Sequence, residues 1–452
     1  MEAMALTATA ESLKVVPADV ILAKIKLGET VSYDHIVVKG NLSSERLALT
    51  AKQILRIPFE VKVGLSDTPI TANSSIIIND SWIQGTVDFE NMIFKKPVVF
   101  QNTVFANSTA FKSCAFNDRA TFAGSDFIED ADFSQSHFMK PADFSEVRLK
   151  GPANFAGTQF DDSASFELNA LYSLASWGGA IFSGPVSFWG SWHNDDTDFN
   201  LTQFKSIAMF DDVLFDGSTS FLGAVFGDVA SFNATQFERK ANFMGADFAA
   251  PVRFEFAIFN QSIGFDSAEF AKIAYFNDAQ FNQSVSFDKS RFDETAEFAR
   301  CTFQNSTDFS GSVFALDCNL NDSALMGPTY FQGARFLGYV DFSGSQFMDD
   351  ALFENTTFEG PVDFSRSCFD KNACLFGAEF QKNAHMENCR IGNLNLTAAS
   401  YPWIFLHWDS IGDFQSNEQA YSAIMKNYEN LGWTEDSRAC YSDFERKKAQ
   451  LR

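Results

Sequence analysis

The densest gathering of chemically versatile side chains lies in the segment FWGSWHNDDTDF, residues 188–199. It contains Trp189, Trp192, His193, Asp195 and Asp196. Aromatic rings and carboxylates at close spacing are side chains with which proteins bind cations and sugars. The segment is therefore a candidate ligand site. Two plainer interpretations stay open, in which His193 replaces an apolar core residue and the aspartates are solvated turn residues.

No catalytic pattern accompanies this segment. The sequence has no Gly-rich phosphate-binding loop, no GxSxG nucleophile elbow and no HExxH zinc motif, and its five histidines lie far apart. The acidic pairs Asp161–Asp162, Asp211–Asp212 and Asp349–Asp350 are more typical of solvated turns than of a calcium site. The sequence thus predicts a protein that is not an enzyme, with no catalytic residues, no metal and no cofactor.

The composition indicates a folded, acidic protein. The chain of 452 residues contains 53 Phe, and its 34 Lys and Arg against 58 Asp and Glu give a net charge of −24. This aromatic content excludes a disordered acidic tail, and the negative charge argues against direct nucleic-acid binding because it repels phosphates. No apolar stretch approaches the roughly 18 residues that a membrane-spanning helix needs.

The phenylalanines recur with a period of eleven residues. From Phe89 onward the gaps between successive Phe residues alternate between five and six, and the phase is kept across the irregular segment between Phe166 and Phe199. Such spacing fits no helix, whereas the recurring order of small residue, polar residue and Phe fits a short strand with both apolar side chains on one side. The Phe residues predicted to stack in the core are Phe89, Phe111, Phe133, Phe155, Phe199, Phe221, Phe243, Phe265, Phe287, Phe309 and Phe353. The small residues predicted to pack beside them are Ala120, Ala131, Ala142, Ala153, Ala230, Ala241 and Ala274.

The repeats ADFSQSHF, ADFSE, ANFAG, ANFMGADF and VDFSG resemble the motif of pentapeptide-repeat proteins. In that motif a small residue, Asp or Asn, and Leu or Phe precede two polar residues. The resemblance covers roughly residues 76–391 and implies an all-β solenoid, a right-handed quadrilateral β-helix with four faces per coil. Because alternate faces here have six residues instead of five, we expect about 22 residues per coil and about 13 coils.

We divide the chain into an N-terminal α/β cap (residues 1–72), the β-helix (73–391) and a C-terminal cap (392–452). In the first cap, residues 16–29 are predicted to form a helix, and residues 33–38 and 59–63 to form strands. In the second, residues 416–432 and 434–452 are predicted to form a helical hairpin. Such caps cover the unpaired strand at each end of a solenoid.

Both ends also resemble the flanking segments of a branch of archaeal pentapeptide-repeat proteins. The resemblance rests on VPADVILAKIKLGETVSYDHIVVKGNL near the start and YENLGWTEDSRACYSDF near the end. In that branch a secretion signal can precede the first segment, and an ion-channel-like membrane segment can follow the hairpin. The resemblance implies an exported or membrane-associated protein whose membrane tether lies outside the given sequence.

Twelve Asn-x-Ser/Thr sites are candidates for glycosylation, which would suit an exported protein. The alternative is that Asn favours corners and Ser or Thr favours the small positions, which creates the pattern without any glycan. Eight of the twelve sites are the main candidates, and most of these lie one or two residues after a core position: Asn41, Asn107, Asn200, Asn233, Asn260, Asn282, Asn305 and Asn355.

Nearly all the negative charge lies on the repeats, where residues 89–380 contain 18 Lys and Arg against 39 Asp and Glu. We favour a non-enzymatic structural or interaction scaffold that binds protein partners, outside the cytoplasm or at the cell surface. The first alternative follows from the resemblance: some family members mimic DNA and occupy the DNA-binding saddle of type II topoisomerases such as gyrase, which would make this protein cytoplasmic. Its outward acidic column would then replace phosphates, at Asp88, Asp132, Asn154, Asp198, Asn242 and Asp308. A weaker alternative is a rod that binds glycans or cations.

Overall fold

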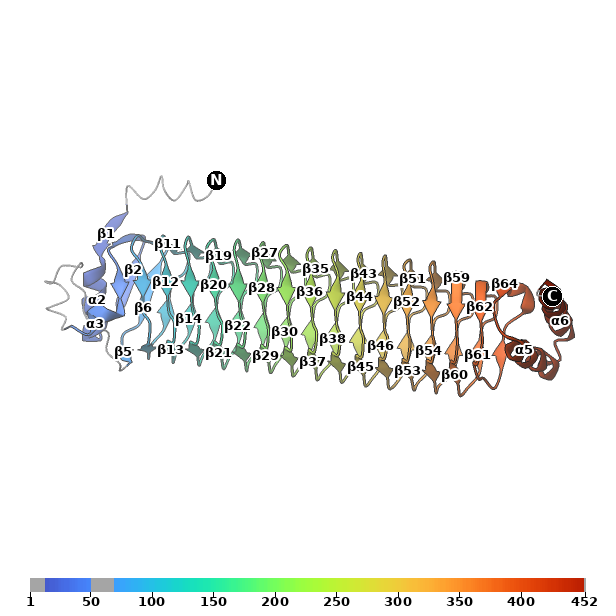
Figure 1. The fold of residues 1–452 in the computed structure, drawn as a ribbon. Helices are drawn as coiled ribbons and strands as arrows, with labels where there is room; N and C mark the ends of the chain where they lie inside the picture. The colour runs from blue at the N-terminus through green and yellow to red at the C-terminus, as the bar shows by residue number, and fades with distance from the viewer. Residues whose placement is uncertain (1–12, 50–68, 451–452) are drawn as a thin grey trace. The chain divides into compact units, whose positions relative to one another are not determined.

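The computed structural model describes residues 13–49 and 69–450. The chain divides into two compact units, residues 1–229 and 230–452. In both units, short strands follow one another in a regular series, and helices lie at the two ends of the chain (Figure 1). The predicted segment 59–63 falls outside the described residues.

Unit 1 is a parallel β-solenoid. One coil consists of β12 (Thr109–Ala110), β13 (Ala115–Phe116), β14 (Ala120–Thr121) and β15 (Asp126–Phe127). These strands pair in parallel with their equivalents in the next coil, β16 (Ala131–Asp132), β17 (His137–Phe138), β18 (Ala142–Asp143) and β19 (Arg148–Leu149). Since Thr109 pairs with Ala131, each coil is 22 residues long, and the predicted solenoid and its repeat length are confirmed. The predicted number of about 13 coils was too low, since one sheet of the described residues, which takes one strand from each coil, has 17 strands. The difference arises because residues before 73 and after 391 also form coils although they lack the Phe period.

Unit 2 repeats this arrangement. One of its coils consists of β36 (Ala241–Asn242), β37 (Asp247–Phe248), β38 (Val252–Arg253) and β39 (Ile258–Phe259). The next coil places β40 (Ile263–Gly264), β41 (Glu269–Phe270), β42 (Ala274–Tyr275) and β43 (Gln280–Phe281) beside them in parallel register. Four strands per coil agree with the four faces that the resemblance implies.

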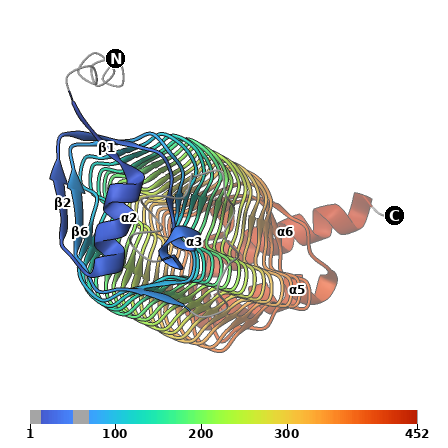
Figure 2. The same ribbon diagram turned by 90° about the vertical axis from the view of Figure 1, so that its left-hand side faces the viewer.

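The N-terminal residues add a helix and further strands to unit 1. Helix α2 (Ala18–Leu27) follows β1 (Lys14–Pro17) and crosses the end of the first coil, as Figure 2 shows. Strands β2 (Val31–Asp34), β3 (Ile36–Lys39) and β4 (Leu42–Ser43) precede the short helix α3 (Ser44–Leu47). They pair in parallel with β6 (Ile76–Asn79), β7 (Trp82–Ile83) and β8 (Val87–Asp88). The predicted helix at 16–29 and strand-forming segment at 33–38 are therefore present.

Unit 2 ends in longer strands and a helical hairpin. Strands β59 (Cys368–Cys374), β62 (Arg390–Asn395) and β64 (Ile411–Phe414) pair in succession, followed by α5 (Glu418–Leu431) and α6 (Thr434–Gln450). The Asn417 side chain accepts a hydrogen bond from the Ala420 N–H at the start of α5, and Gly432 ends the helix with φ 75°. The predicted hairpin is thus confirmed. Within residues 13–49 and 69–450, every helix is too short or too polar to span a lipid bilayer.

The interior of each unit consists of stacked aromatic rings. In unit 1, Phe133 and Phe155 are fully buried, with ring centroids 5.1 Å apart and planes 2° apart. Rings of neighbouring columns meet edge to face, as Phe144 and Phe155 do at 5.2 Å and 87°. Trp177 takes the place of a Phe and stacks on Phe155. All the Phe and Ala residues predicted for the core are buried in the structure. Stacked and edge-to-face rings each add stability beyond the area they bury.

The corner that follows every second strand requires a left-handed backbone. Residues two positions after every second core Phe have positive φ, for example Asn91 (57°), Gly157 (66°) and Gly245 (61°). Glycine adopts this conformation without strain, whereas for most other residues it costs roughly 1–2 kcal/mol of conformational energy. Phe256 also adopts it, with φ 59° and 62% of its surface exposed. The corner conformation is therefore set by the coil and not by the residue that occupies it.

Replacing Gly245 with alanine is expected to lower the free energy of unfolding by about 0.5–1 kcal/mol, because the strain of a left-handed alanine exceeds the entropy gained in the unfolded chain. A Cβ at Gly245 would meet nothing within 4 Å, so steric overlap makes no contribution. Gly227→Ala is the matched control. Gly227 does not have a positive φ and the nearest atom to its Cβ would lie at 3.5 Å, so this variant should be slightly more stable. Equal urea midpoints for the two variants would contradict the prediction.

Candidate functional site

The segment 188–199 divides between the inside and the outside of unit 1. Strand β27 (Trp192–His193) directs Trp192 outward and His193 inward. His193 is 1% exposed, with Nε2 3.0 Å from Ser191 Oγ and Nδ1 3.2 Å from Thr197 Oγ1. Burial lowers the pKa of His193 to about 3, so the ring is neutral at physiological pH. His193 is therefore a core residue and is not part of the outward-facing group.

The outward-facing group is built from three successive coils. The Trp192 Nε1–H donates to Asp216 Oδ2 at 2.5 Å, and the Trp192 ring meets the Tyr172 ring edge to face at 5.1 Å. The Trp189 Nε1–H donates to Asp212 Oδ2 at 3.1 Å. Tyr172 is 42% exposed and Trp189 is 40% exposed. We call Tyr172, Trp189, Trp192, Asp212 and Asp216 the aromatic–acidic surface.

Asp195 and Asp196 lie beside this surface, at the corner between β27 and β28 (Thr197–Asp198). Both are exposed. Asp195 Oδ1 accepts the Asp196 N–H at 2.8 Å, and Asp196 Oδ1 accepts the Ser218 N–H of the next coil, also at 2.8 Å. A Cβ on Gly217 would lie only 2.1 Å from the Asp195 carbonyl carbon, so this corner requires glycine there. The two carboxylates therefore have fixed positions and still face solvent.

Tyr172, Asp212 and Asp216 were not among the predicted site residues. Each contacts a tryptophan that lies 20 to 24 residues away, which is close to the length of one coil. The 22-residue period could have located them, because residues about one period apart lie on neighbouring coils. Chain proximity alone, which grouped Trp189 with Asp195 and Asp196, does not find them.

The sequence was compared with models of known protein families. A model described as pentapeptide repeats matches it in nine copies, over more than half of its length. The matched residues include 89–137, 133–167, 210–258, 265–313, 287–333, 309–357, 320–367 and 331–377. The chain belongs to the pentapeptide-repeat family. No curated protein sequence matches this pentapeptide-repeat chain.

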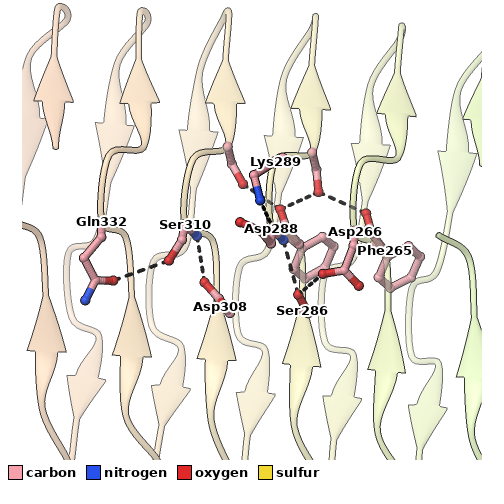
Figure 3. Close-up of polar contacts among 11 residues, drawn as sticks. Phe265, Asp266, Ser286, Asp288, Lys289, Asp308, Ser310 and Gln332 are labelled. Carbon is pink, nitrogen blue, oxygen red and sulfur yellow. Dashed lines mark hydrogen bonds and ion pairs between the residues drawn. The ribbon is translucent and has the colours of Figure 1, made fainter. Parts of the chain in front are cut away.

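The Asp or Asn of the pentapeptide repeat stabilises the corner that follows it. In unit 1, Asp132 Oδ1 accepts the Ser134 N–H at 2.9 Å, and Asp198 Oδ1 accepts the Asn200 N–H at 2.8 Å. In unit 2, Asp308 Oδ1 accepts the Ser310 N–H at 2.8 Å (Figure 3). Such side-chain bonds to the backbone two residues on are favoured by Asp and Asn. The outward acidic column therefore has a structural use in addition to its charge.

A second polar cluster of this pentapeptide-repeat chain lies near its start and was also missed. His35 Nδ1 lies 2.8 Å from Asp34 Oδ2, and potential ligand atoms of Asp34, His35 and Asp80 lie within 4.8 Å of one another. The hydrogen bond with Asp34 raises the pKa of His35. An ion pair between Asp34 and His35 accounts for this geometry. The sequence separation of 45 residues between His35 and Asp80 differs from the coil period and concealed the cluster.

The eight candidate glycosylation sites named above all lie outside the core of the solenoid. Asn305 and Asn355 are exposed, whereas the other six are partly buried. Several of these amides bond to neighbouring coils: the Asn282 Nδ2–H donates to Asn260 Oδ1 at 2.6 Å, and the Asn107 Nδ2–H donates to the Gln84 carbonyl at 2.7 Å. Among these eight sites, Asn305 and Asn355 are therefore the most accessible to a modifying enzyme.

All seven cysteines are free thiols, and most of them fill small interior positions. The Cys114 thiol donates to the Phe89 carbonyl at 2.8 Å, and the Cys301 thiol donates to the Phe276 carbonyl at 3.0 Å. In other coils a serine does the same, as Ser136 does with Phe111. Burial raises the pKa of the Cys389 thiol to about 11. These cysteines act as small packing residues of the repeat.

Proposed function

We propose that this protein is a non-enzymatic scaffold that binds protein partners through its outward-facing side chains. The observation that carries the proposal is that aromatic rings of the candidate site are exposed, whereas its histidine and the repeat aspartates have structural roles. His193 is buried and neutral, and the aspartates of the repeat bond to corner N–H groups, whereas the rings of Tyr172 and Trp189 remain exposed. Exposed rings beside carboxylates serve binding better than catalysis.

The construction of the solenoid supports a scaffold role. The buried Phe rings and small residues set the register between coils, so the outward residue of each strand is not needed for it. Neighbouring coils can therefore present different side chains on an unchanging backbone, which is how repeat proteins build binding surfaces.

Site-specific photo-crosslinking in the cells that make the protein tests this proposal. A photoreactive residue is placed at the outward positions Trp189 and Gln203 in unit 1 and Gln280 in unit 2. Irradiation should give a discrete protein adduct from at least one of these positions. If every outward position on all four faces, tested in turn, gives no adduct, the proposal is wrong.

We also propose that the scaffold works outside the cytoplasm, in association with a membrane. The exposed sequons at Asn305 and Asn355 support an exported protein. The mass of the protein purified from its native source tests this, because a glycan adds mass to the peptides that carry these residues. Unmodified peptides recovered from a cytoplasmic fraction would contradict it.

DNA mimicry is a second candidate, favoured by the acidity of the repeats. Residues 89–380 carry a net charge of 18 minus 39, or −21, which is roughly one to two negative charges per coil. Over the same rise of about 4.8 Å, duplex DNA carries about three phosphates. We therefore expect no inhibition in a gyrase supercoiling assay at micromolar protein. Inhibition that disappears with added salt would favour mimicry over the scaffold.

A further inference from the structure

We propose that the aromatic–acidic surface of unit 1 binds an arginine- or lysine-rich segment of a partner protein. This inference rests on the scaffold function proposed above and names the class of partner that this surface fits. It follows from three features of the surface: fixed aromatic rings, carboxylates held next to them, and the absence, among residues 13–49 and 69–450, of a cation over the faces of these rings.

The two indole rings are held in place by the carboxylates of the following coil. Trp192 donates to Asp216 at 2.5 Å and Trp189 donates to Asp212 at 3.1 Å. Because each indole N–H is used within the protein, the parts of the rings that remain exposed are apolar. Cations are attracted to aromatic faces, and Arg is the most frequent partner of Trp in such contacts. Each ring therefore offers a cation both an aromatic surface and a carboxylate.

The surroundings of this surface are strongly acidic. Residues 148–229, which include the strand of the coil before Tyr172, contain ten acidic residues and three basic residues, Arg148, Lys150 and Lys205. The acidic residues are Asp161, Asp162, Glu167, Asp195, Asp196, Asp198, Asp211, Asp212, Asp216 and Asp228. Such a field increases the association rate and the affinity for a positively charged segment, and it repels an anionic one.

Some outward aromatic rings elsewhere in the protein are covered by its own cations. In unit 2 the Arg253 guanidinium lies 4.5 Å from the centre of the Tyr275 ring, one coil further along. In unit 1 the Lys24 ammonium lies 4.8 Å from the centre of the Tyr33 ring. Within residues 13–49 and 69–450, no cation of the chain covers Tyr172, Trp189 or Trp192 in this way. The space over the ring face, which the Arg253 guanidinium occupies at Tyr275, is therefore available to a partner's cation at these three rings.

Fluorescence anisotropy with a labelled peptide of alternating glycine and arginine tests the inference on the full chain. Trp192→Ala leaves the charge of the protein unchanged, and it should weaken binding about fivefold or more because it removes a cation–π contact. Trp192→Phe keeps a ring and should bind more tightly than Trp192→Ala. Asp216→Asn should also weaken binding and reduce its dependence on salt. Thermal midpoints near that of the wild type will show that each variant is folded.

Two variants of unit 2 serve as matched controls. Tyr275→Ala removes an outward ring that Arg253 already covers, and Asp349→Asn removes an acidic charge that already pairs with Lys371 at 2.7 Å. Both should bind the peptide as the wild type does. If Trp192→Ala also binds it unchanged, the affinity is general electrostatic attraction and the inference is wrong. Saturable binding of a neutral oligosaccharide with no binding of the peptide would overturn it in favour of a glycan site.

The two proposals fail in different ways. If partners are crosslinked at other outward positions and Trp192→Ala binds the peptide normally, the scaffold proposal stands and the proposal of a cationic partner is wrong. The absence of any crosslinked partner would remove the scaffold itself, whatever the peptide measurements give.

Discussion

Replacing Phe243 with alanine is expected to lower the free energy of unfolding by about 3–5 kcal/mol, among the largest effects of any single substitution in unit 2. Phe243 is fully buried. Its ring stacks on Phe265 at 5.1 Å and meets Phe232 and Phe254 edge to face, at 5.4 Å each. Alanine would leave a cavity that the coils cannot close, because their spacing is fixed by the backbone hydrogen bonds between strands.

Urea unfolding measures this effect, and Phe376→Ala is its matched control. Phe376 is 43% exposed and lies on the outside of the same unit. The same change in chemistry should cost less than about 1 kcal/mol there, because little buried area is lost. If the two variants unfold at the same urea concentration, the stacked rings are not the main source of stability. A lower slope for Phe243→Ala would show instead that the coils no longer unfold together.

The period of the Phe residues was enough to predict the short strands and the core, because one spacing sets both, and the resemblance to pentapeptide repeats supplied the four-faced solenoid. Phe155 can be assigned to the interior because it follows Phe133 by one coil length in the sequence, even when the residues next to it are not considered. The same counting places Trp177 in the column, although the local sequence is irregular. Repeat proteins are favourable in this respect, since each coil contacts mainly the next one and long-range contacts recur at one fixed separation.

The outward surface was harder to predict, because the repeat does not determine it. The Trp192 side chain is long enough to contact Tyr172 on the preceding coil and Asp216 on the following coil. The 22-residue period does not predict these contacts, because the residues are 20 and 24 positions apart. The cluster of Asp34, His35 and Asp80 was hidden for another reason. The pairing of β2 with β6 spans 45 residues, so the 22-residue count does not apply at the first coil.

The alternation of the repeat also left the aspartate column ambiguous. A polar residue between a small residue and Phe must point outward, which suits a phosphate mimic and a soluble surface equally well. In the folded protein, the Asp132 and Asp308 carboxylates each accept a hydrogen bond from the backbone N–H two residues on. Replacement of such a residue would therefore affect a corner as well as the surface charge, a consequence that the pattern of charges alone does not reveal.

His193→Phe is expected to make the protein more resistant to acid. The unfolded chain binds a proton at His193 below about pH 6.5, whereas burial lowers the pKa of the folded state to about 3. Between these values unfolding takes up a proton, so the free energy of unfolding falls by about 1.4 kcal/mol for each pH unit as the pH decreases. The wild type should therefore lose about 4–5 kcal/mol more than His193→Phe between pH 7 and pH 3. Above pH 7 the histidine is neutral in both states, so this contribution is absent there.

The difference between wild type and variant isolates this histidine, because the carboxylates of the acidic surface titrate in both proteins and cancel. Phenylalanine suits the position, since His193 lies in a column with Phe215 at 4.8 Å, although Ser191 and Thr197 lose a hydrogen-bond partner. That loss lowers stability equally at every pH, so it shifts the curve of stability against pH and does not change its slope. His193→Leu should show the same reduced slope. Parallel curves for the wild type and both variants would mean that His193 is already accessible to protons in the folded coil, and the account of it as a neutral core residue would fail.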